Sequence, residues 1–307
     1  MGRILTLSNL VTETPVVGPQ AFSSSVVGEQ VTISLREIGI PPRPSVLQEI
    51  DRERAKPEPD FKRLTDLISS DVALAAAVVK TANAPAFGLS RKVGVISEAV
   101  VLLGLSPVMQ TVAGIVLQRV FRYSPGMERF WDSSAAVARV SSWLVQRLDL
   151  QRRVRSGDVY TFGLFRDCGI PLLMGPFPEY RAVLAAANAA SDCAFTDVEN
   201  AALGMNHAVM GARLAVEWGL PEEMVLAIEH HHDVAHLTGE AEGLTPRGCL
   251  MVALAQLAEY LVQTQTGQGQ TCEWLKLGSA CLDVLDLDPD RLPSLGLECS
   301  ELLSAAA

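Results

Sequence analysis

Positive charge is scarce in this sequence. Its 25 Lys and Arg residues stand against 35 Asp and Glu residues, which gives a formal net charge of -10 at pH 7. A molecule of this sign repels a phosphate backbone, so we expect no nucleic acid partner. The local exception is "QRLDLQRRVRSG", where four arginines predict either a small anion-binding patch or, as is usual for such runs, a solvated connection: Arg147, Arg152, Arg153 and Arg155.

The sequence also lacks a long hydrophobic run and paired cysteines. Glu98 and Gln110 bracket the most apolar stretch, "AVVLLGLSPVM", and polar residues interrupt any signal-peptide core near the N-terminus. The six cysteines form no CxxC pair and no zinc-ribbon spacing. We therefore expect a cytoplasmic protein in a reducing compartment, without disulfides and without insertion into a membrane.

Common catalytic motifs are missing as well. There is no P-loop, no G-x-G-x-x-G and no G-x-S-x-G in the chain. Cys168 stands next to Asp167 in "GLFRDCGIP", and a neighbouring carboxylate raises the pKa of a thiol rather than lowering it. We expect Cys168 to be packed rather than reactive.

Helical character is present almost throughout. Hydrophobic residues make up 49% of the chain, which is typical of a globular protein. Residues 1–34 are rich in Val, Ser, Thr, Pro and Gly, and we interpret them as a leader that is extended or loosely ordered. From Leu35 onward the breaks fall at Pro and Gly, and no β-α alternation follows. The sequence predicts an all-α protein.

Capping residues mark the expected helix ends in the first half. Ser70 or Asp71 is placed to cap a helix that runs to Asn83. In the next segment Ser97 is an expected N-cap and Gly104 an expected C-terminal stop. A further helix is expected with Ser106 as N-cap and Pro107 as its first residue, and its predicted buried face consists of Val108, Val112, Ile115 and Val116.

Three separated motifs point to one family. They are "IPPRPSVLQEI" with "LISSDVALAAAVVKTANAPAFGLSRKVGVISEAVVLLGL", then "GLFRDCGIPLL", then "NHAVMGARLAVEWGLPEEMVLAIEHHHD". In this order and at these separations they resemble the HDOD family, the HD-related output domains of bacterial signalling proteins. The resemblance implies an all-α, HD-domain-like fold over residues 35–265, with an N-terminal helical bundle at 35–122 and a degenerate HD-like part at 123–265. Residues 266–307 are then a C-terminal helical extension.

The resemblance also locates the residues that hold metal in active HD enzymes. Those enzymes use a first His, a His-Asp pair and a distal Asp. In this sequence the first position falls at Asp132, the pair at Arg166 and Asp167, and the distal position at Gln256. Asp167 alone matches, so we expect no metal at these four positions and no cofactor.

Arg166 decides the chemistry of this site. A guanidinium stays protonated at physiological pH and has no lone pair, so it opposes a cation rather than binding one. One interpretation is that Arg166 forms an ion pair with Asp132 or Asp167 and takes the place of the metal charge. The alternative is that Arg166 points to solvent from the end of a helix.

The five histidines all lie between residues 207 and 236. The resemblance makes His207, His231 and His232 remnants of the ancestral pocket, in which they can still hold a small anion or a nucleotide together with Asp167. His232 and His236 are four residues apart and would share one helical face, where they could chelate a metal, if that helix continued past Asp233. Core or cleft histidines with hydrogen-bonded rings are the more common outcome.

The leading functional hypothesis is a non-enzymatic signal-transduction or scaffold module that acts through protein–protein interaction. The family resemblance suggests a sensor kinase, a response regulator or a cyclic-dinucleotide enzyme as partner. Two alternatives remain open: a residual metal-dependent HD phosphohydrolase in which the histidines and Asp167 hold one metal, and a nucleotide-binding sensor that uses the remnant pocket. The oligomeric state is also open.

Overall fold

The first elements in the described part of the chain form a β-hairpin. The computed structural model describes residues 21–26, 29–34, 41, 44–83, 91–121 and 127–304. Strands β1 (Ala21–Val26) and β2 (Glu29–Ser34) pair antiparallel, with Ala21 opposite Ser34. The predicted leader is therefore extended over these twelve positions, and the rest of it lies outside the described residues.

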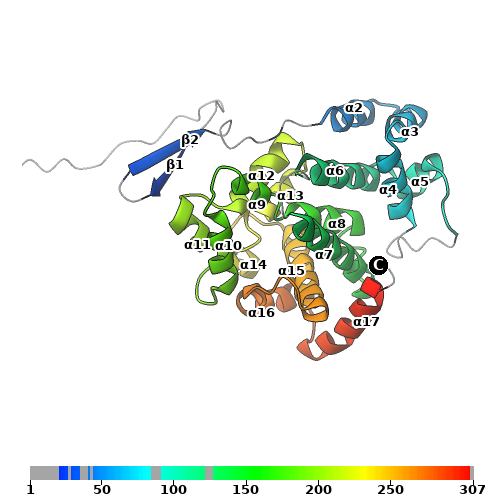
Figure 1. Cartoon of the computed structure of the whole chain (residues 1–307). Coiled ribbons are helices and arrows are strands. Elements are labelled where there is room, and N and C mark those ends of the chain that lie inside the picture. Colours follow the sequence, from blue (N-terminus) through cyan, green and yellow to red (C-terminus); the bar gives the residue numbers. More distant parts are fainter. Residues whose placement is uncertain are drawn as a thin grey trace, which may run out of the picture.

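The first helical group follows the hairpin. All described elements from residue 45 onward are helical, which confirms the all-α class. Figure 1 shows this group beside the larger helical body. Its helices are α2 (Ser45–Arg54), α3 (Phe61–Ser69), α4 (Val72–Ala82), α5 (Ile96–Leu103) and α6 (Leu105–Phe121).

Two of the predicted helix ends are confirmed and two are wrong. The Asp71 side chain accepts hydrogen bonds from the amides of Ala73 and Leu74 and so caps α4. Gly104 ends α5 with a φ of 78°, a conformation that favours glycine. The N-cap of α5 is Val95 rather than Ser97, and α6 begins at Leu105, one residue before the predicted cap.

The valine face of α6 is buried as predicted. Val108 and Val112 are fully buried, Val116 is 7% exposed, and Ile115 packs partly buried against the core. Helix α6 packs against α4 and α5 of the first helical group and also against α8 of the body, where a Cβ on Gly114 of α6 would meet Leu164. Helix α6 therefore joins the first helical group to the rest of the molecule.

The body continues in helices of very different length. The longest of them are α7 and α15, which pack against each other. The elements are α7 (Glu128–Arg147), α8 (Ser156–Phe165), α9 (Gly169–Met174), α10 (Tyr180–Ala189), α11 (Phe195–Leu203), α12 (His207–Glu217), α13 (Glu222–Glu229), α14 (Val234–Thr238), α15 (Pro246–Thr266), α16 (Glu273–Leu285), the 3-10 turn η2 (Pro289–Arg291) and α17 (Leu292–Ser304).

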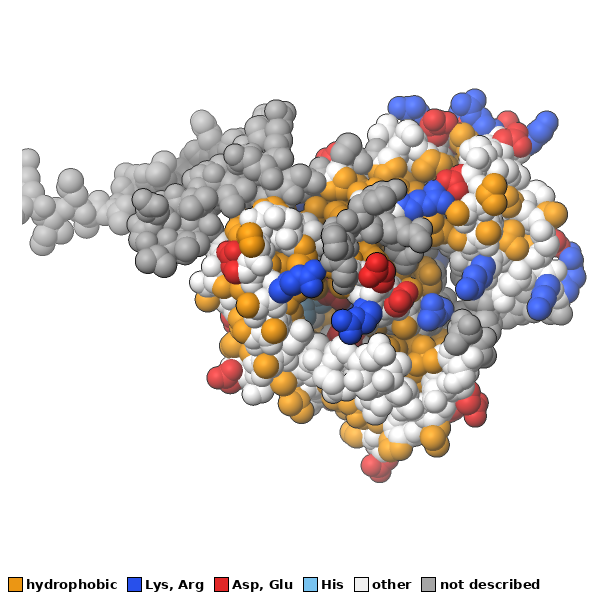
Figure 2. Space-filling model, viewed as in Figure 1, with side chains coloured by type: hydrophobic (Ala, Val, Ile, Leu, Met, Phe, Trp, Pro, Cys, Tyr) orange, Lys and Arg blue, Asp and Glu red, His pale blue; other side chains and the backbone are white. Residues whose placement is uncertain are grey.

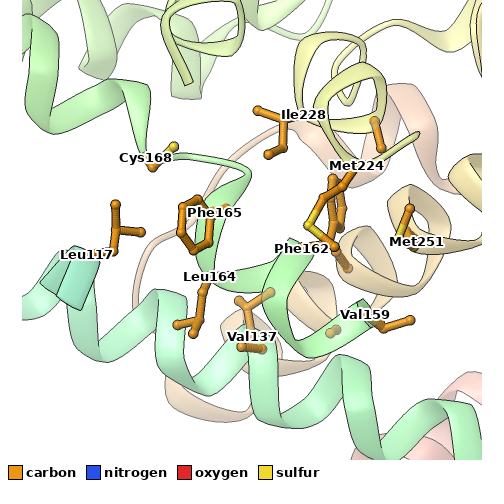
Figure 3. Packing of buried hydrophobic residues seen from close by; sticks show 14 of the residues in the cluster. Leu117, Val137, Val159, Phe162, Leu164, Phe165, Cys168, Met224, Ile228 and Met251 are labelled. Atoms are coloured by element: carbon orange, nitrogen blue, oxygen red, sulfur yellow. The ribbon is translucent and has the colours of Figure 1, made fainter. Parts of the chain in front are cut away.

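Helix α8 is the centre of the core. Eight of its ten residues are buried, so no side of this helix faces solvent. Figure 3 shows Phe162, Leu164 and Phe165 of this helix pointing in different directions, toward Val137 of α7 and Ile228 of α13 among others. Because the core surrounds α8, the turn that follows it is held in a fixed position.

Two glycines bring α9 and α12 into backbone contact. A Cβ on Gly169 would lie 1.9 Å from the carbonyl oxygen of His207 and 2.7 Å from the amide nitrogen of Gly211. A Cβ on Gly211 would lie 3.3 Å from the amide nitrogen of Gly169. Only glycine permits this approach, which sets the distance between the start of α9 and the start of α12.

The C-terminal helices pack on the body. Helix α16 contacts α15 and α14, and α17 contacts α15 and α7. The leucine-rich pieces around a proline, expected after Gly267, are therefore present as α16, η2 and α17. Among the described helices, none combines the length and the apolar character that crossing a bilayer requires.

Candidate functional site: a buried arginine and three converging histidines

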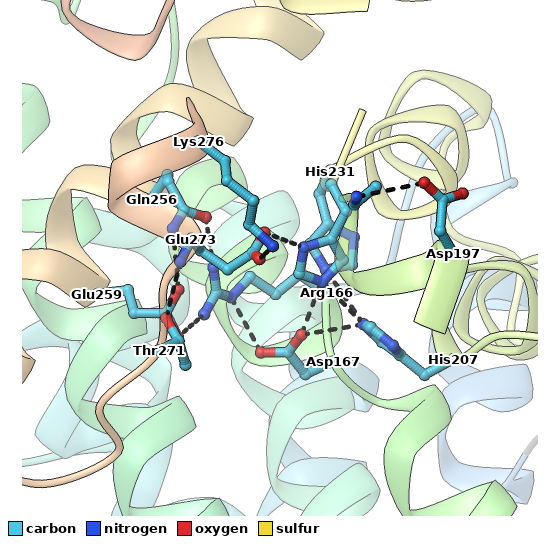
Figure 4. A network of polar contacts seen from close by, with 12 residues as sticks. Arg166, Asp167, Asp197, His207, His231, Gln256, Glu259, Thr271, Glu273 and Lys276 are labelled. Carbon is cyan, nitrogen blue, oxygen red and sulfur yellow. Dashed lines mark hydrogen bonds and ion pairs between the residues drawn. The ribbon is translucent and has the colours of Figure 1, made fainter. Parts of the chain in front are cut away.

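Arg166 and Asp167 occupy the turn between α8 and α9. Arg166 is the residue that ends α8, and Cys168 precedes the first residue of α9. The pair thus lies at the end of the most buried helix rather than inside a helix. Its side chains emerge beside α12 and α15, as Figure 4 shows.

The Arg166 side chain is buried and surrounded by acceptors. Only 4% of the residue is exposed. Its Nε lies 3.1 Å from Asp167 Oδ2, its Nη2 lies 2.9 Å from Glu259 Oε1, and its Nη1 lies 3.4 Å from Gln256 Oε1. Burial opposes the charge, but the carboxylates of Asp167 and Glu259 outweigh burial and raise the pKa of the guanidinium. Arg166 is a permanent cation inside the site.

The structure decides between the two interpretations of Arg166. Its ion pairs are with Asp167 and Glu259, so a solvent-facing arginine is wrong. Asp132 is exposed on α7 and lines the cavity above the pair without joining these ion pairs. Gln256 is buried on α15, and its amide nitrogen donates to Glu259 Oε2 at 3.2 Å.

Three histidines meet next to Asp167. His207 Nε2 lies 3.4 Å from His231 Nε2 and 3.2 Å from His232 Nε2. Asp167 Oδ1 lies 3.3 Å from His231 Nε2 and 3.5 Å from His207 Nε2. All three rings are buried. The predicted remnant histidines and Asp167 therefore form one cluster.

The other ring nitrogen of each histidine is held by an acceptor. His207 Nδ1 lies 2.7 Å from Glu199 Oε2, and His232 Nδ1 lies 2.5 Å from Glu273 Oε2. His231 Nδ1 lies 2.7 Å from the carbonyl oxygen of Ile228. These acceptors assign the ring proton to Nδ1 in all three residues and leave Nε2 facing the cluster.

The carboxylates of Glu199 and Glu273, which hold His207 and His232, each have a second hydrogen-bonding or ionic partner. The Tyr180 hydroxyl donates to Glu199 Oε1, and the Lys276 ammonium pairs with Glu273 Oε1. Burial raises the pKa of Glu273, but the hydrogen bond from His232 and the ion pair with Lys276 lower it to about 2. Glu273 is thus an anion that is fixed in place beside His232.

A cluster with three inward Nε2 atoms and one carboxylate oxygen requires a cation. Burial disfavours a charge on His207, but Glu199 and Asp167 outweigh it and raise the pKa of His207 to about 10. Burial and the neighbouring His232 instead lower the pKa of His231 to about 3. A proton on His207 therefore satisfies the cluster. The same four atoms, all within 4.8 Å of one another, also fit a single divalent metal ion.

The condition for His232 and His236 to share one helical face is not met. Helix α13 ends at Glu229 and α14 begins only at Val234, so the helix does not continue between the two histidines. His236 Nδ1 instead lies 2.8 Å from Asp233 Oδ2, and its ring stacks on His230 with 3.9 Å between the ring centres.

Three acidic residues of the site were not predicted from the sequence. Glu259 stands three residues after Gln256 on α15, and this helical spacing was a usable signal. Glu199 lies on α11 and Glu273 on α16, and nothing in their local sequence distinguishes them from surface acids. Glu273 also shows that the C-terminal extension completes the site.

A cavity of about 800 Å³ opens over Arg166 and Asp167. Helices α7, α10 and α15 contribute to its walls, together with the turn after α15 and the start of α16. Its volume lies within the range of small-molecule sites in proteins.

The comparisons with known proteins agree with this architecture. The HDOD domain profile matches residues 40–234, which is more than half of the chain. An uncharacterized protein of Treponema pallidum (strain Nichols) is 28% identical over 206 residues, covering 67% of this chain and 40% of that protein. The chain therefore spans less than half the length of this relative.

Solved structures share the fold at low identity. An HDOD domain protein of unknown function from Geobacter sulfurreducens has a TM-score of 0.57 and 22% identity, covering 85% of this chain and 93% of its own. A Shewanella amazonensis SB2B protein named as a candidate metal-dependent phosphohydrolase has a TM-score of 0.63, 16% identity and coverages of 88% and 93%. A candidate signal transduction protein from Marinobacter aquaeolei VT8 has a TM-score of 0.63, 23% identity and coverages of 88% and 60%. By its profile match and its helical architecture, the chain belongs to the HDOD family.

Proposed function

We propose that this protein is a non-catalytic signalling module that acts by binding other proteins. The observation that carries the proposal is the Arg166 guanidinium, which is buried between Asp167 and Glu259. A second metal ion beside Asp167 would face this fixed positive charge at close range. Two-metal activation of a phosphate ester is therefore disfavoured by the chain itself.

The module has surface that suits docking. On α5, Val101 is 70% exposed and Leu102 is 48% exposed, and Val72 at the start of α4 is 82% exposed. Exposed apolar residues that gather on one helical group are typical of contact surfaces. A sensor kinase, a response regulator or a cyclic-dinucleotide enzyme is the partner class that we propose, with the cytoplasm as the location.

An assay for phosphate ester hydrolysis tests the absence of catalysis. The purified protein is incubated with bis-p-nitrophenyl phosphate and p-nitrophenyl phosphate in the presence of Mn²⁺, Mg²⁺ or Fe²⁺. We expect no rate above that of the Asp167→Ala variant. A metal-dependent rate that disappears in Asp167→Ala would contradict the proposal.

A second candidate function is a residual phosphohydrolase with one metal ion. It is favoured by one observation, the convergence of three Nε2 atoms and Asp167 Oδ1 with each Nδ1 already held. His207, His231, His232 and Asp167 would hold the ion, which would act as a Lewis acid toward a phosphate oxygen. Arg166 would then stay an ion-pair partner of Asp167.

Elemental analysis separates metal binding from catalysis. Protein dialysed against a metal-free buffer is titrated with Zn²⁺, Mn²⁺ or Fe²⁺ and analysed after gel filtration. Retention of one ion per chain, lost in His207→Asn and kept in His236→Asn, would establish the four-ligand site. If no ion is retained, the single-metal candidate is ruled out and the proton on His207 is the cation of the cluster.

A further inference from the structure

The cavity over the site has arginines on its wall that the site itself does not use. Arg129 and Arg139 lie on α7 and Arg181 lies on α10, and all three are exposed and line the cavity. Figure 2 shows Lys and Arg side chains standing around a hollow in this face, with acidic side chains between them. The chain as a whole carries a net charge of -10, whereas four arginines and four acids line the cavity, so the lining is less acidic than the molecule as a whole.

The acids inside the cavity already have cationic partners. Asp167 and Glu259 pair with Arg166, and Glu273 pairs with His232 and Lys276. Arg129 and Arg139, in contrast, form no ion pair within the part of the chain that the structure describes. Their charge is opposed at the rim by Asp132, which lines the same wall. A bound anion would therefore meet uncompensated positive charge first.

The spacing of the two α7 arginines fits an extended ligand. They are ten residues apart, which corresponds to about 15 Å along a helix. A small inorganic anion spans only a fraction of that distance. A larger molecule with an anionic group at one arginine and its body across the cavity can use both.

The inner walls suit an apolar, flat body. Phe130 and Phe195 line the cavity together with Ile170, Met174 and Leu184. Phe195 lies parallel to His232, with 4.8 Å between the ring centres, so one aromatic wall is already held in place. Ser133 of α7 and Asn188 of α10 add a hydroxyl and an amide to this lining.

We propose that the cavity binds an organic phosphate with an aromatic body, with its phosphate held by one of the two α7 arginines, Arg129 or Arg139, its body reaching toward the other, and its ring between Phe130 and Phe195. This inference rests on the proposed function in one respect, namely that the ligand is bound and not cleaved. Binding would occur within the signalling module itself, beside α10, α15 and α16. The bound molecule is then the input that the module reports to its partner.

Calorimetric titration with defined probes tests the inference. AMP and ADP carry both the phosphate and the aromatic body, adenosine lacks the phosphate, and inorganic phosphate and glucose 6-phosphate lack the aromatic body. EDTA is present throughout, so that binding through a metal ion does not contribute. We expect saturable binding of AMP or ADP, and weaker binding of the other three probes.

Paired charge variants provide the control. The double variant R129A/R139A should lose about tenfold or more in affinity, because charged hydrogen bonds to the phosphate are removed. The double variant R152A/R153A removes the same charge from exposed arginines that do not line the cavity, and it should bind like wild type. Circular dichroism of both variants verifies that they are folded.

The possible outcomes are distinct. Absence of AMP and ADP binding, equal binding of adenosine, or an equal loss in R152A/R153A would overturn the inference and leave the proposed function standing. Release of inorganic phosphate from AMP or ADP, measured in parallel with Mn²⁺ in place of EDTA, would overturn the proposed function and leave the binding site standing.

Discussion

Arg166 supplies from within the chain the positive charge that the acids of this site need. Asp167 and Glu259 are partly buried at the floor of the cavity, where an unpaired carboxylate is costly. A metal-dependent site meets that cost with an ion from solution, and so depends on its supply. Here the chain itself carries the positive charge, which is present whenever the chain is folded.

Removal of this charge should destabilise the protein strongly. We expect Arg166→Met to lower the free energy of unfolding by about 3–5 kcal/mol, since it leaves the partly buried carboxylates of Asp167 and Glu259 without their guanidinium partner. Arg147→Met is the matched control, because Arg147 pairs with Glu298 at the solvent-exposed surface and its loss should lower stability far less. Urea denaturation measures both. Equal losses would mean that burial of the Arg166 pair is not what matters.

Replacement of Arg166 by histidine should make stability depend on metal. We expect Arg166→His to unfold at lower urea concentration than wild type in EDTA and to recover partly when Zn²⁺ or Mn²⁺ is added, since a ligand that binds only the folded state stabilises it. Wild type in the same two buffers is the reference. An Arg166→His protein as stable as wild type in EDTA would contradict the assigned role of the guanidinium.

The sequence located part of this site in advance. Asp167, Gln256 and the histidine group could be placed because a motif or a family position carries them. Glu199 and Glu273 could not, because each becomes part of the site only when α11 and α16 pack beside the histidines. Acids that are brought in by tertiary packing leave no local pattern.

Helix α6 connects the first helical group to the body, and its valine face is buried. Val112 is fully buried there. We expect Val112→Asp to lose several kcal/mol, an appreciable part of a domain's stability, because it buries an unpaired charge. Val101→Asp makes the same change at a position that is 70% exposed and should shift stability by about 0.5 kcal/mol or less. Thermal melting that failed to separate the two variants would contradict the assigned face.

The cap of α4 gives a prediction about pH. The hydrogen bonds from Arg119 lower the pKa of Asp71 below its ordinary value of 3.8, while burial opposes the shift and the amides of Leu74 and Ala73 add to it. A lowered folded-state pKa contributes stability that is present above pH 3.8 and is lost as the pH falls below that value. We expect Asp71→Asn to be less stable than wild type at pH 7, with a smaller difference at pH 3.

Arg119→Met provides the complementary measurement. It removes the same ion pair from the α6 side, so its loss of stability should shrink over the same pH range. A loss that is independent of pH in both variants would show that the charge of Asp71 does not carry the effect. Helix ends such as this one were predictable where a side chain caps them. The start of α5 was not, because Val95 has no side-chain acceptor to reveal it.

On the scale of the whole molecule, the order of the helices followed from the sequence and their packing did not. Pro, Gly and capping residues predicted where helices break, and apolar spacing predicted which faces are buried. The central place of α8 has no such signal, since a helix that is apolar on all sides shows no face. The contribution of α16 to the site also became visible only in three dimensions.

The six cysteines should report on the integrity of the packed body. Cys168, Cys281 and Cys299 are buried, and burial raises the pKa of Cys281 to about 12 and that of Cys299 to about 11. We expect a thiol reagent at pH 8 to modify these three only as the protein unfolds. The partly exposed thiols of Cys193 and Cys272 should react in the native state. Rapid native-state modification of all six would contradict the described core.

The close approach of α9 and α12 leaves one position without any freedom to vary. A side chain on Gly169 would collide with the carbonyl oxygen of His207, which is a backbone atom. No second substitution elsewhere in the chain can remove a backbone atom, so no compensating mutation exists. In a library that carries every amino acid at residue 169, selection for folded protein should return glycine alone, whereas its neighbours Cys168 and Ile170 should return several.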